Sequence, residues 1–294
     1  MSILHFISPP IPYFIDCGRA LFNPGEQHIR RSGIGVFDLI VVTKGTLHVG
    51  EAAQEWSVRQ GEAIILRPDL THFGAAPCTE ETTIIWIHFN TFGSWDERPD
   101  MNACLANQAA LIETHKMSAY LNHSEVSAIF IPRQTKLSVK AVELLEQFFQ
   151  LEHEPRSLRN WKRQSSFQLF VQHLDRELAA TSDGTALHLA DRIELYLRQN
   201  YTRPITNTML QKELNYHPNY LAKCMQKVYG MTPIDYLFHY RLEQAKKLLI
   251  QTNWSIARIS EEVGFRHGSY FSYCFSNNEG ISPLQYRRKF IGHP

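Results

Sequence analysis

Two segments near the C-terminal end of the chain share one pattern. Residues 205–230 and 255–280 each contain a short apolar-periodic helix, a turn, and a second helix with aromatic and small polar residues. They end in matching sequences, Gly-Met-Thr-Pro-Ile and Gly-Ile-Ser-Pro-Leu, which begin at Gly230 and Gly280. One helix-turn-helix occurs in many all-α proteins, whereas a repeated one is far more specific. The repeat predicts a double helix-turn-helix unit that reaches double-stranded DNA at two places.

The segment between the two units predicts one long helix. Residues 233–251 begin with Pro at the first helical turn. Their apolar positions form one helical stripe: Ile234, Leu237, Leu242, Ala245, Leu248 and Leu249. At 1.5 Å per residue this helix is roughly 28 Å long, close to the ~34 Å between adjacent segments of the major groove. We expect it to hold two recognition helices in adjacent segments. The alternative is a helical bundle that binds no nucleic acid.

Charge is distributed unevenly along the chain. The whole sequence has 30 Lys and Arg against 29 Asp and Glu. Residues 185–294 have 14 basic and 8 acidic side chains, and the rest of the chain has 16 and 21. The C-terminal part is therefore the part suited to a polyanion. Such an excess favours phosphate contacts and carries no information on base sequence.

The composition favours a cytoplasmic protein with no membrane partner. No stretch reaches the roughly 18 uninterrupted apolar residues of a membrane span. The first residues, MSILHFISPPIPYF, have neither a basic leader nor a cleavage site, so we expect no signal peptide. The five cysteines are scattered without metal-ligand spacing, which suits a reducing compartment.

Many residues of the two units occur in one fixed order. In the first unit they are Tyr220, Leu221, Gly230 to Pro233, Tyr236, Leu237, Arg241, Leu242, Ala245, Leu248 and Leu249. In the second they are Ile256, Ile259, Val263 to Phe265, Ser269 to Phe271, Phe275, Gly280 to Pro283, Tyr286 and Arg287. With these residues the final ninety positions closely resemble the DNA-binding domain of the AraC/XylS family of bacterial transcription regulators.

Five positions depart from the family pattern. In the first unit Gln211 replaces a small Ala, Asn215 replaces the turn Gly, and His217 replaces a Ser cap. Asn tolerates the left-handed conformation that a turn needs, whereas His is a poorer cap than Ser. In the second unit Ser260 replaces an Ala, and Gly268 starts the recognition helix less stably than most residues would. The first unit is therefore expected to be the less rigid one.

Helical spacing and the resemblance together indicate which side chains face DNA. On the first recognition helix, residues 218–229, Tyr220, Leu221, Cys224, Met225 and Val228 follow core spacing. The outer face then consists of Asn219, Ala222, Lys223, Gln226 and Lys227. The family's base-reading positions fall on the first three of these. Asn can pair with adenine, Lys can donate to guanine, and the Ala methyl can contact thymine.

The second recognition helix has a different face. Tyr270, Phe271, Cys274 and Phe275 are interpreted as core, which leaves His267, Gly268, Ser269, Ser272 and Tyr273 for the groove. Because this face has few long cationic side chains, we expect it to depend on phosphates and DNA shape. Arg287 and Arg288 of the last helix are predicted phosphate contacts. The alternative for each residue is a solvated surface position.

From about Cys17 to Phe89 the pattern becomes β. Short runs rich in Val, Ile, Phe and Trp occupy residues 36–42, 45–49, 63–66 and 82–89, with turn signals between them. Residues 61–72 look like the second conserved motif of cupin barrels, and residues 86–89 resemble the closing strand of sensor domains in the same regulator family. The expected fold class is therefore α+β, with an N-terminal antiparallel cupin-like β-barrel and a C-terminal all-α domain.

A cupin raises the question of a metal enzyme. Metal-dependent cupins resemble one another in an early His-x-His with a carboxylate, completed by a later His, and residues 27–38 contain no such pair. His72 and His88 alone make a poor case, so we predict no metal, no cofactor and no catalytic residue. A barrel can still hold a small organic effector. The candidate effector-binding residues are Arg30, His72, Phe73, Trp86 and His88, with ordinary packing as the alternative.

Two amphipathic helices are predicted between the β region and the repeat, at residues 136–153 and 158–180. Their stripes contain Leu137, Ala141, Leu144, Phe148, Leu151, Trp161, Phe167, Phe170, Leu174 and Leu178. The resemblance implies that this pair forms a homodimer, and the alternative is that it covers the barrel. The expected divisions are an effector-binding domain at 1–130, connector helices at 131–180, a linker at 181–187 and a DNA-binding domain at 188–294.

These features predict a ligand-responsive, sequence-specific transcription regulator. Effector occupancy would shift paired DNA-binding domains between two arrangements on a promoter. The expected partners are promoter DNA, a small-molecule effector, a second copy of the chain and, for an activator, RNA polymerase. The resemblance slightly favours a carbohydrate, and genes for the uptake or use of a small molecule. Two alternatives are a metal-dependent cupin enzyme fused to a helical bundle and an effector-independent DNA-binding protein.

Overall fold

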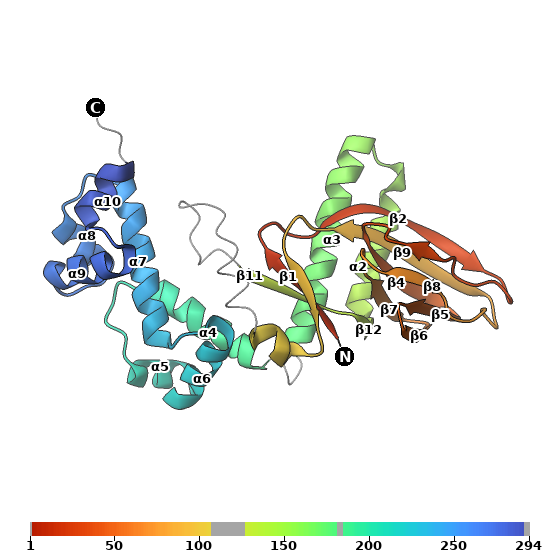
Figure 1. Ribbon diagram of the computed structural model, residues 1–294, viewed down its shortest axis with the longest axis horizontal. Coiled ribbons are helices and arrows are strands. Elements are labelled where there is room, and N and C mark those ends of the chain that lie inside the picture. The colour runs from red at the N-terminus through yellow and green to blue at the C-terminus, as the bar shows by residue number, and fades with distance from the viewer. Residues whose placement is uncertain (1, 107–126, 181–184, 291–294) are drawn as a thin grey trace. The chain divides into compact units, whose positions relative to one another are not determined.

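The protein has a β-rich N-terminal unit and a helical C-terminal unit. The structure, a computed structural model, describes residues 2–106, 127–180 and 185–290, and the chain divides into two compact units after Thr181 (Figure 1). The predicted linker, 181–187, lies partly outside the described residues, and its last three residues begin a helix. Within the described ranges, no helix is both long and apolar enough to cross a membrane.

The N-terminal unit contains three antiparallel sheets. A five-stranded sheet has the order β12-β7-β4-β9-β2, a four-stranded sheet the order β3-β8-β5-β6, and a three-stranded sheet the order β10-β1-β11. The strands are β1 Ile3–Ser8, β2 Tyr13–Phe22, β3 Arg31–Ser32, β4 Phe37–Lys44, β5 Thr46–Glu51, β6 Gln54–Arg59, β7 Glu62–Leu66, β8 Thr71–Gly74, β9 Thr82–Asn90, β10 Trp95–Arg98, β11 Ser127–Pro132 and β12 Gln134–Lys136. The prediction of antiparallel β structure is confirmed. The pairings among these described strands form separate sheets and do not close a barrel.

The five-stranded sheet is buried on both faces. Successive side chains of a strand point to opposite faces, so each strand contributes to two cores. On β9, Ile85 and Ile87 belong to a core shared with helices and the three-stranded sheet, whereas Ile84 belongs to a core shared with the four-stranded sheet. On β4, residues 37–42 are all buried, which explains their continuous apolar run apart from Asp38.

Two helices cover one face of that sheet. Helices α2 (Val139–Phe149) and α3 (Arg156–Ala179), with the 3-10 turn η2 (Gln150–His153) between them, bury Phe148, Phe167 and Phe170 in the shared core. Most of the predicted apolar stripe therefore covers the strands. Trp161 differs, since it is 76% exposed.

Polar side chains of α3 also complete the edge strand β2. Gln164 accepts a hydrogen bond from the Phe14 N–H at 3.0 Å and donates one to the Phe14 carbonyl at 2.6 Å. Gln168 donates to the Pro12 carbonyl at 2.5 Å. These amides satisfy backbone groups that an open sheet edge would leave available for another strand.

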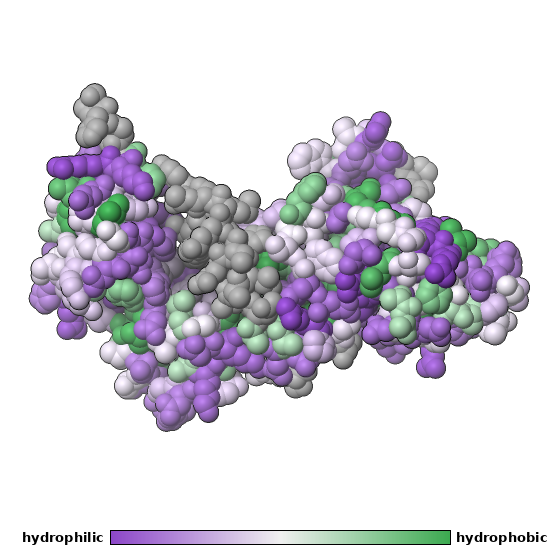
Figure 2. All heavy atoms as spheres, viewed as in Figure 1, coloured by the Kyte–Doolittle hydropathy of each residue, from purple (hydrophilic) through white to green (hydrophobic). Residues whose placement is uncertain are grey.

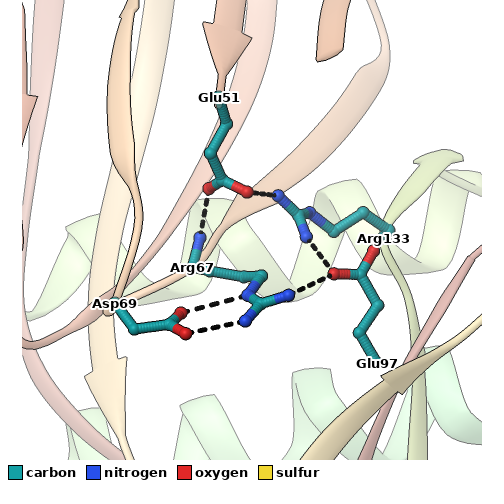
Figure 3. A network of polar contacts seen from close by, with 5 residues as sticks. All are labelled: Glu51, Arg67, Asp69, Glu97 and Arg133. Carbon is teal, nitrogen blue, oxygen red and sulfur yellow. Dashed lines mark hydrogen bonds and ion pairs between the residues drawn. The ribbon is translucent and has the colours of Figure 1, made fainter. Parts of the chain in front are cut away.

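A buried ion network joins the three sheets (Figure 3). Arg133, between β11 and β12, forms ion pairs with Glu51 at the end of β5 and with Glu97 on β10. The second oxygen of Glu51 accepts the Arg67 N–H at 2.6 Å, and the Arg67 guanidinium contacts Glu97 and Asp69. The Arg133 and Glu51 side chains are each only 2% exposed, so this pair links the sheets where water cannot replace its hydrogen bonds.

The sequence pattern is wrong about where the β region starts and ends. Strand β1 and the first residues of β2 precede Cys17, and β10, β11 and β12 follow Phe89. The prolines between β1 and β2 look like a loop, and strands of three or four residues have too few positions to reveal alternation. These strands form because of pairing partners distant in sequence, such as Ile3 with Pro132.

The C-terminal unit contains seven helices in its described range. They are α4 Thr185–Asn200, α5 Asn207–Leu214, α6 Pro218–Tyr229, α7 Pro233–Gln251, α8 Ile256–Glu262, α9 Gly268–Glu279 and α10 Pro283–Phe290. Helix α7 has the predicted bounds and packs with α4 and α6 on one side and with α8 and α10 on the other (Figure 1). The prediction of a helical C-terminal domain with two helix-turn-helix units is confirmed.

Two tyrosine hydroxyl groups fasten helix α4 to helices α6 and α7. Tyr229 Oη donates to Asp191 at 3.0 Å, and Tyr236 Oη donates to Glu194 at 2.7 Å. Burial raises the pKa of both tyrosines and of Asp191.

On the visible face of the protein, hydrophilic residues predominate and apolar ones are scattered (Figure 2), which is the usual surface of a folded chain with its large apolar side chains inside.

Candidate DNA-binding interface and effector pocket

The outer face of α6 presents polar side chains. Asn219, Lys223 and Lys227 are exposed and Ala222 is half-buried, while Leu221, Cys224, Met225 and Val228 are buried. The helix begins at His217, whose Nδ1 accepts the Asn219 N–H at 3.3 Å. The apolar spacing of the sequence produces this division because buried positions recur every three or four residues. Asn219, Ala222 and Lys223 therefore occupy the first two turns, where a recognition helix contacts base edges.

Two side chains of α6 differ from their predicted roles. Tyr220, interpreted as core, is 40% exposed and lies beside Tyr216, with ring centroids 5.6 Å apart. Gln226 donates from Nε2 to the Gly230 carbonyl at 2.6 Å. Its amide therefore stabilises the end of α6. Spacing cannot distinguish Tyr220 from a core residue, because it is next to the buried Leu221.

Helix α9 has a smaller and more aromatic outer face. His267 and Ser269 are exposed, and Ser272 is half-buried. Tyr273 is 64% exposed, and Tyr270, interpreted as core, is 57% exposed. Gly268 lies against α8, since a Cβ there would be 3.6 Å from the Ala257 Cα. This distance is an ordinary van der Waals contact, so the neighbouring helix does not require Gly at this position. Tyr270 is added to the exposed face.

The start of α9 lacks a side-chain cap. His267, at the cap position, makes no capping hydrogen bond, whereas His217 makes one at the start of α6. His217, expected to be a poor cap, thus caps the recognition helix of the first helix-turn-helix, whereas the recognition helix of the second has no side-chain cap. An uncapped start leaves backbone N–H groups available to phosphates.

The basic side chains of α10 have different surroundings. The Arg287 guanidinium donates to the Leu249 carbonyl at 3.1 Å and to the Trp254 carbonyl at 2.6 Å. It fastens α10 to the end of α7, where carbonyls are left without helical partners. Arg288 and Lys289 are exposed. Arg266, which precedes α9 and is exposed, is a further cation that the sequence analysis did not select.

Replacement of Asn215 by Ala is expected to destabilise the first helix-turn-helix by about 1 kcal/mol. Asn215 ends α5 in the left-handed conformation, with φ 60° and ψ 33°, which costs Ala more than Asn. Urea unfolding followed by circular dichroism measures the loss. Lys212→Ala, on the exposed side of α5, is the control and should change stability by less than about 0.5 kcal/mol. Equal stability of Asn215→Ala and wild type would contradict the argument.

In the N-terminal unit, three of the five predicted effector residues share one interior. Trp86 and His88 of β9 lie on the face directed at the four-stranded sheet, as Ile84 does. His72 of β8 is fully buried and pairs with Arg31 across the strands. The Trp86 and His88 rings are 4.7 Å apart, and His88 Nε2 is 3.7 Å from the Asp38 carboxylate. The fold therefore places an aromatic wall beside a group of polar side chains.

Arg30 and Phe73 do not belong to this group. Phe73 follows the inward-facing His72 in β8, so strand alternation directs it to the opposite face. Arg30 precedes β3 and is exposed. The Arg30 guanidinium lies over the Phe73 ring at 5.7 Å, and Phe73 covers Gly50. The structure thus separates the predicted effector set into an inner group and an outer pair.

Gly18 makes room for the aromatic wall. Gly18 of β2 pairs with Trp86 of β9, and a Cβ at Gly18 would lie 2.5 Å from the Trp86 ring. Only Gly allows the indole to lie across the strand at this position. The sequence alone does not indicate this role for Gly18, because an isolated Gly in a strand does not show which ring approaches it.

The inner group also contains two residues that are not among the predicted effector-binding residues. His28, which precedes β3, is buried, and its ring centroid is 5.2 Å from that of His72. Asp38 of β4 is 1% exposed, and one carboxylate oxygen is 3.9 Å from the Arg31 guanidinium. Burial lowers the pKa of His28, and lowers that of His72 to about 4. Both imidazoles are therefore neutral near pH 7, with lone pairs available to a ligand.

Two helix-turn-helix units with exposed polar faces, joined by one long helix, define a DNA-binding protein of the double helix-turn-helix class. A family described as a helix-turn-helix domain matches residues 210–289. The HTH-type transcriptional regulator YisR of Bacillus subtilis is 33% identical over 293 residues, which cover 98% of each chain. The MmsAB operon regulatory protein of Pseudomonas aeruginosa is 27% identical, over 84% of this chain and 72% of its own.

Among solved structures, the C-terminal domain of AraT, a response regulator from Geobacillus stearothermophilus, is 31% identical with a TM-score of 0.35. The match covers 36% of this chain and 88% of that domain. The chain belongs to the AraC family of helix-turn-helix transcription regulators. This confirms the family predicted from the residues. Because the relatives are transcription regulators, it also confirms that the chain is a regulator and not an enzyme.

Proposed function

We propose that the chain regulates transcription in response to a small molecule bound between the sheets of its N-terminal unit. The observation that carries this proposal is the inner group of His28, Asp38, His72, Trp86 and His88. A packed structural core has little use for so many polar groups, whereas a ligand site combines an aromatic wall with a few convergent polar groups. The interior between the sheets is the proposed effector site, and the N-terminal unit is the proposed sensor domain.

We propose that α6 reads base edges and that α9 contributes phosphate and shape contacts. Asn219 and Lys223 support base reading by their exposure near the start of α6, beside the half-buried Ala222. Lys227, His267, Ser269, Ser272, Tyr273 and Arg288 complete the proposed interface, together with Tyr220 and Tyr270. The protein would act in the cytoplasm, where promoter DNA is found, and would contact RNA polymerase if it is an activator.

Homodimerisation is part of the proposal. Large apolar side chains remain exposed on the two helices that cover the sheet, namely Val139, Val142, Leu158, Trp161 and Leu169. Exposed apolar side chains of this size on a connector are suited to a second copy of the chain. We retain the division into an effector-binding part at 1–130, the connector at 131–180 and a DNA-binding part that starts with α4.

The test begins with a thermal-shift screen of sugars, organic acids and aromatic compounds on the full chain. The best ligand is then added in footprinting of a DNA site obtained by in vitro selection. We expect the ligand to change promoter affinity or the length of the protected region by its differential binding to two states. Trp86→Ala should abolish the thermal shift and retain binding to the selected DNA. If promoter binding responds to no ligand, the alternative of an effector-independent DNA-binding protein is favoured.

A further inference from the structure

We propose that His28, Asp38 and His72 form a binding site for one divalent first-row transition-metal ion. These residues come from three places in the sequence: the segment before β3, strand β4 and strand β8. All three are buried, and each offers one potential ligand atom within 4.8 Å of the others. In a site with metal–ligand bonds of about 2.1 Å, neighbouring ligand atoms are roughly 3.0–3.4 Å apart, so side-chain rotations that shorten these distances by about 1–2 Å bring the three into coordination distance.

The hydrogen bonding of the group also supports a metal site. His28 Nδ1, Asp38 Oδ1, both ring nitrogens of His72 and His88 Nε2 are buried without a hydrogen-bond partner in the part of the chain that the structure describes. Buried polar atoms are normally paired, and a gathered set of unpaired ones needs an explanation. If these side chains only packed, a neutral imidazole would donate to Asp38. The nearest one, His88, lies 3.7 Å away, beyond a good hydrogen bond.

The donor types select the ion. Two imidazoles and one carboxylate suit Zn²⁺, Fe²⁺, Co²⁺ or Ni²⁺, whereas Mg²⁺ and Ca²⁺ prefer oxygen donors alone. Arg31 is the competing cation, at 3.9 Å from Asp38. Its side chain is 36% exposed, so its guanidinium can move to solvent when a metal neutralises the carboxylate. His88 is close enough to Asp38 to serve as a fourth ligand or to orient the carboxylate.

Three protein ligands leave coordination positions for water or for an oxygen of another molecule. Trp86 lies beside His88, so a small molecule with hydroxyl or carboxylate oxygens could reach the ion while its ring or chain contacts the indole. This consequence rests on the proposed function, because it assigns the effector's anchor. Metal binding itself does not rest on it and can be measured without DNA or effector.

The experiment uses the purified full chain, stripped with EDTA and dialysed. Co²⁺ is titrated while visible absorption is recorded, and bound Zn²⁺ is measured by elemental analysis after desalting. We expect one ion per chain and a rise in thermal stability. Asp38→Asn and His72→Gln preserve side-chain size and should weaken binding by at least about 100-fold. His48→Gln is the matched control, because His48 is outside the group and bonded to Ser57, and it should bind as wild type does.

Binding of one ion that both variants lose and the control retains supports the site. A wild-type chain that retains no Co²⁺ or Zn²⁺ after desalting overturns it, and so does unchanged binding by Asp38→Asn and His72→Gln. Circular dichroism establishes that each variant is folded, and the wild-type stoichiometry is decisive if one is not. A wild-type chain that binds no metal ion, while its promoter binding still responds to a ligand, would overturn the site and leave the proposed function standing. A chain that binds one ion, but whose promoter binding responds to no ligand, would support the metal site and overturn the proposed function.

Discussion

Glu51→Gln is expected to destabilise the N-terminal unit by roughly 3–5 kcal/mol, the cost of removing one partner of a buried ion pair. Glu51 and Arg133 are each 2% exposed. The amide of Gln can still accept the Arg67 N–H, but its NH₂ group then faces the Arg133 guanidinium, donor against donor. Glu97 remains as an ion-pair partner of Arg133 (Figure 3). The measurement is urea unfolding followed by tryptophan fluorescence, because Trp56 and Trp95 lie near the network.

Asp69→Asn is the matched control within the same network. Asp69 binds the Arg67 guanidinium, but its side chain is 50% exposed, so its loss should cost less than about 1 kcal/mol. A Glu51→Leu and Arg133→Met double variant removes both charges and should be more stable than Glu51→Gln alone. A loss of under 1 kcal/mol for Glu51→Gln would show that the pair does not join the sheets as described.

Lys223→Ala is expected to weaken binding to the selected DNA site by about 10- to 100-fold, equivalent to ~1–3 kcal/mol, and to relax the preference for one base. Lys223 is exposed on the outer face of α6, next to the polar positions near its start. Its ammonium can donate to guanine, and Ala removes that donor without disturbing the buried face of the helix. Fluorescence anisotropy with the selected site and with scrambled DNA measures both effects.

Lys289→Ala provides the comparison. Lys289 is exposed on α10 and is one of three consecutive basic residues. If Lys289 contacts a phosphate, its loss weakens binding to both DNAs alike. The slope of log binding constant against log salt concentration then becomes shallower by about one. Equal losses on selected and scrambled DNA for both variants would overturn the assignment of α6 as the reading helix.

The helical half of the protein could be predicted in detail because its signals are local. Helices α6 and α7 have the predicted bounds, since each begins at a Pro that is acceptable only in a first turn and follows an apolar period of 3.6 residues. The exposure of side chains at the edge of an apolar helix face is less predictable. Tyr220 and Tyr270 are next to buried residues, and a difference of one position decides whether a ring is covered.

For the β-rich half, the sequence predicts antiparallel β structure but does not predict which residues meet at the candidate site. Arg30 and Phe73 are predicted to join His72, yet Phe73 lies on the other face of its sheet because side chains alternate, and Arg30 lies over the Phe73 ring. His28 and Asp38 were passed over, since neither follows the His-x-His spacing of metal-dependent cupins. Their meeting with His72 depends on strand pairing between distant segments.

The amino-acid sequence by itself determined that this protein has a β-rich half and a double helix-turn-helix of the AraC family, because helix caps, apolar periods and turn residues act within about ten to twenty positions of one another. Only the tertiary structure decided which buried polar groups face each other between the sheets. A one-residue change of register moves every side chain of a strand to its opposite face, so pairing between distant segments places His28, Asp38 and His72 together.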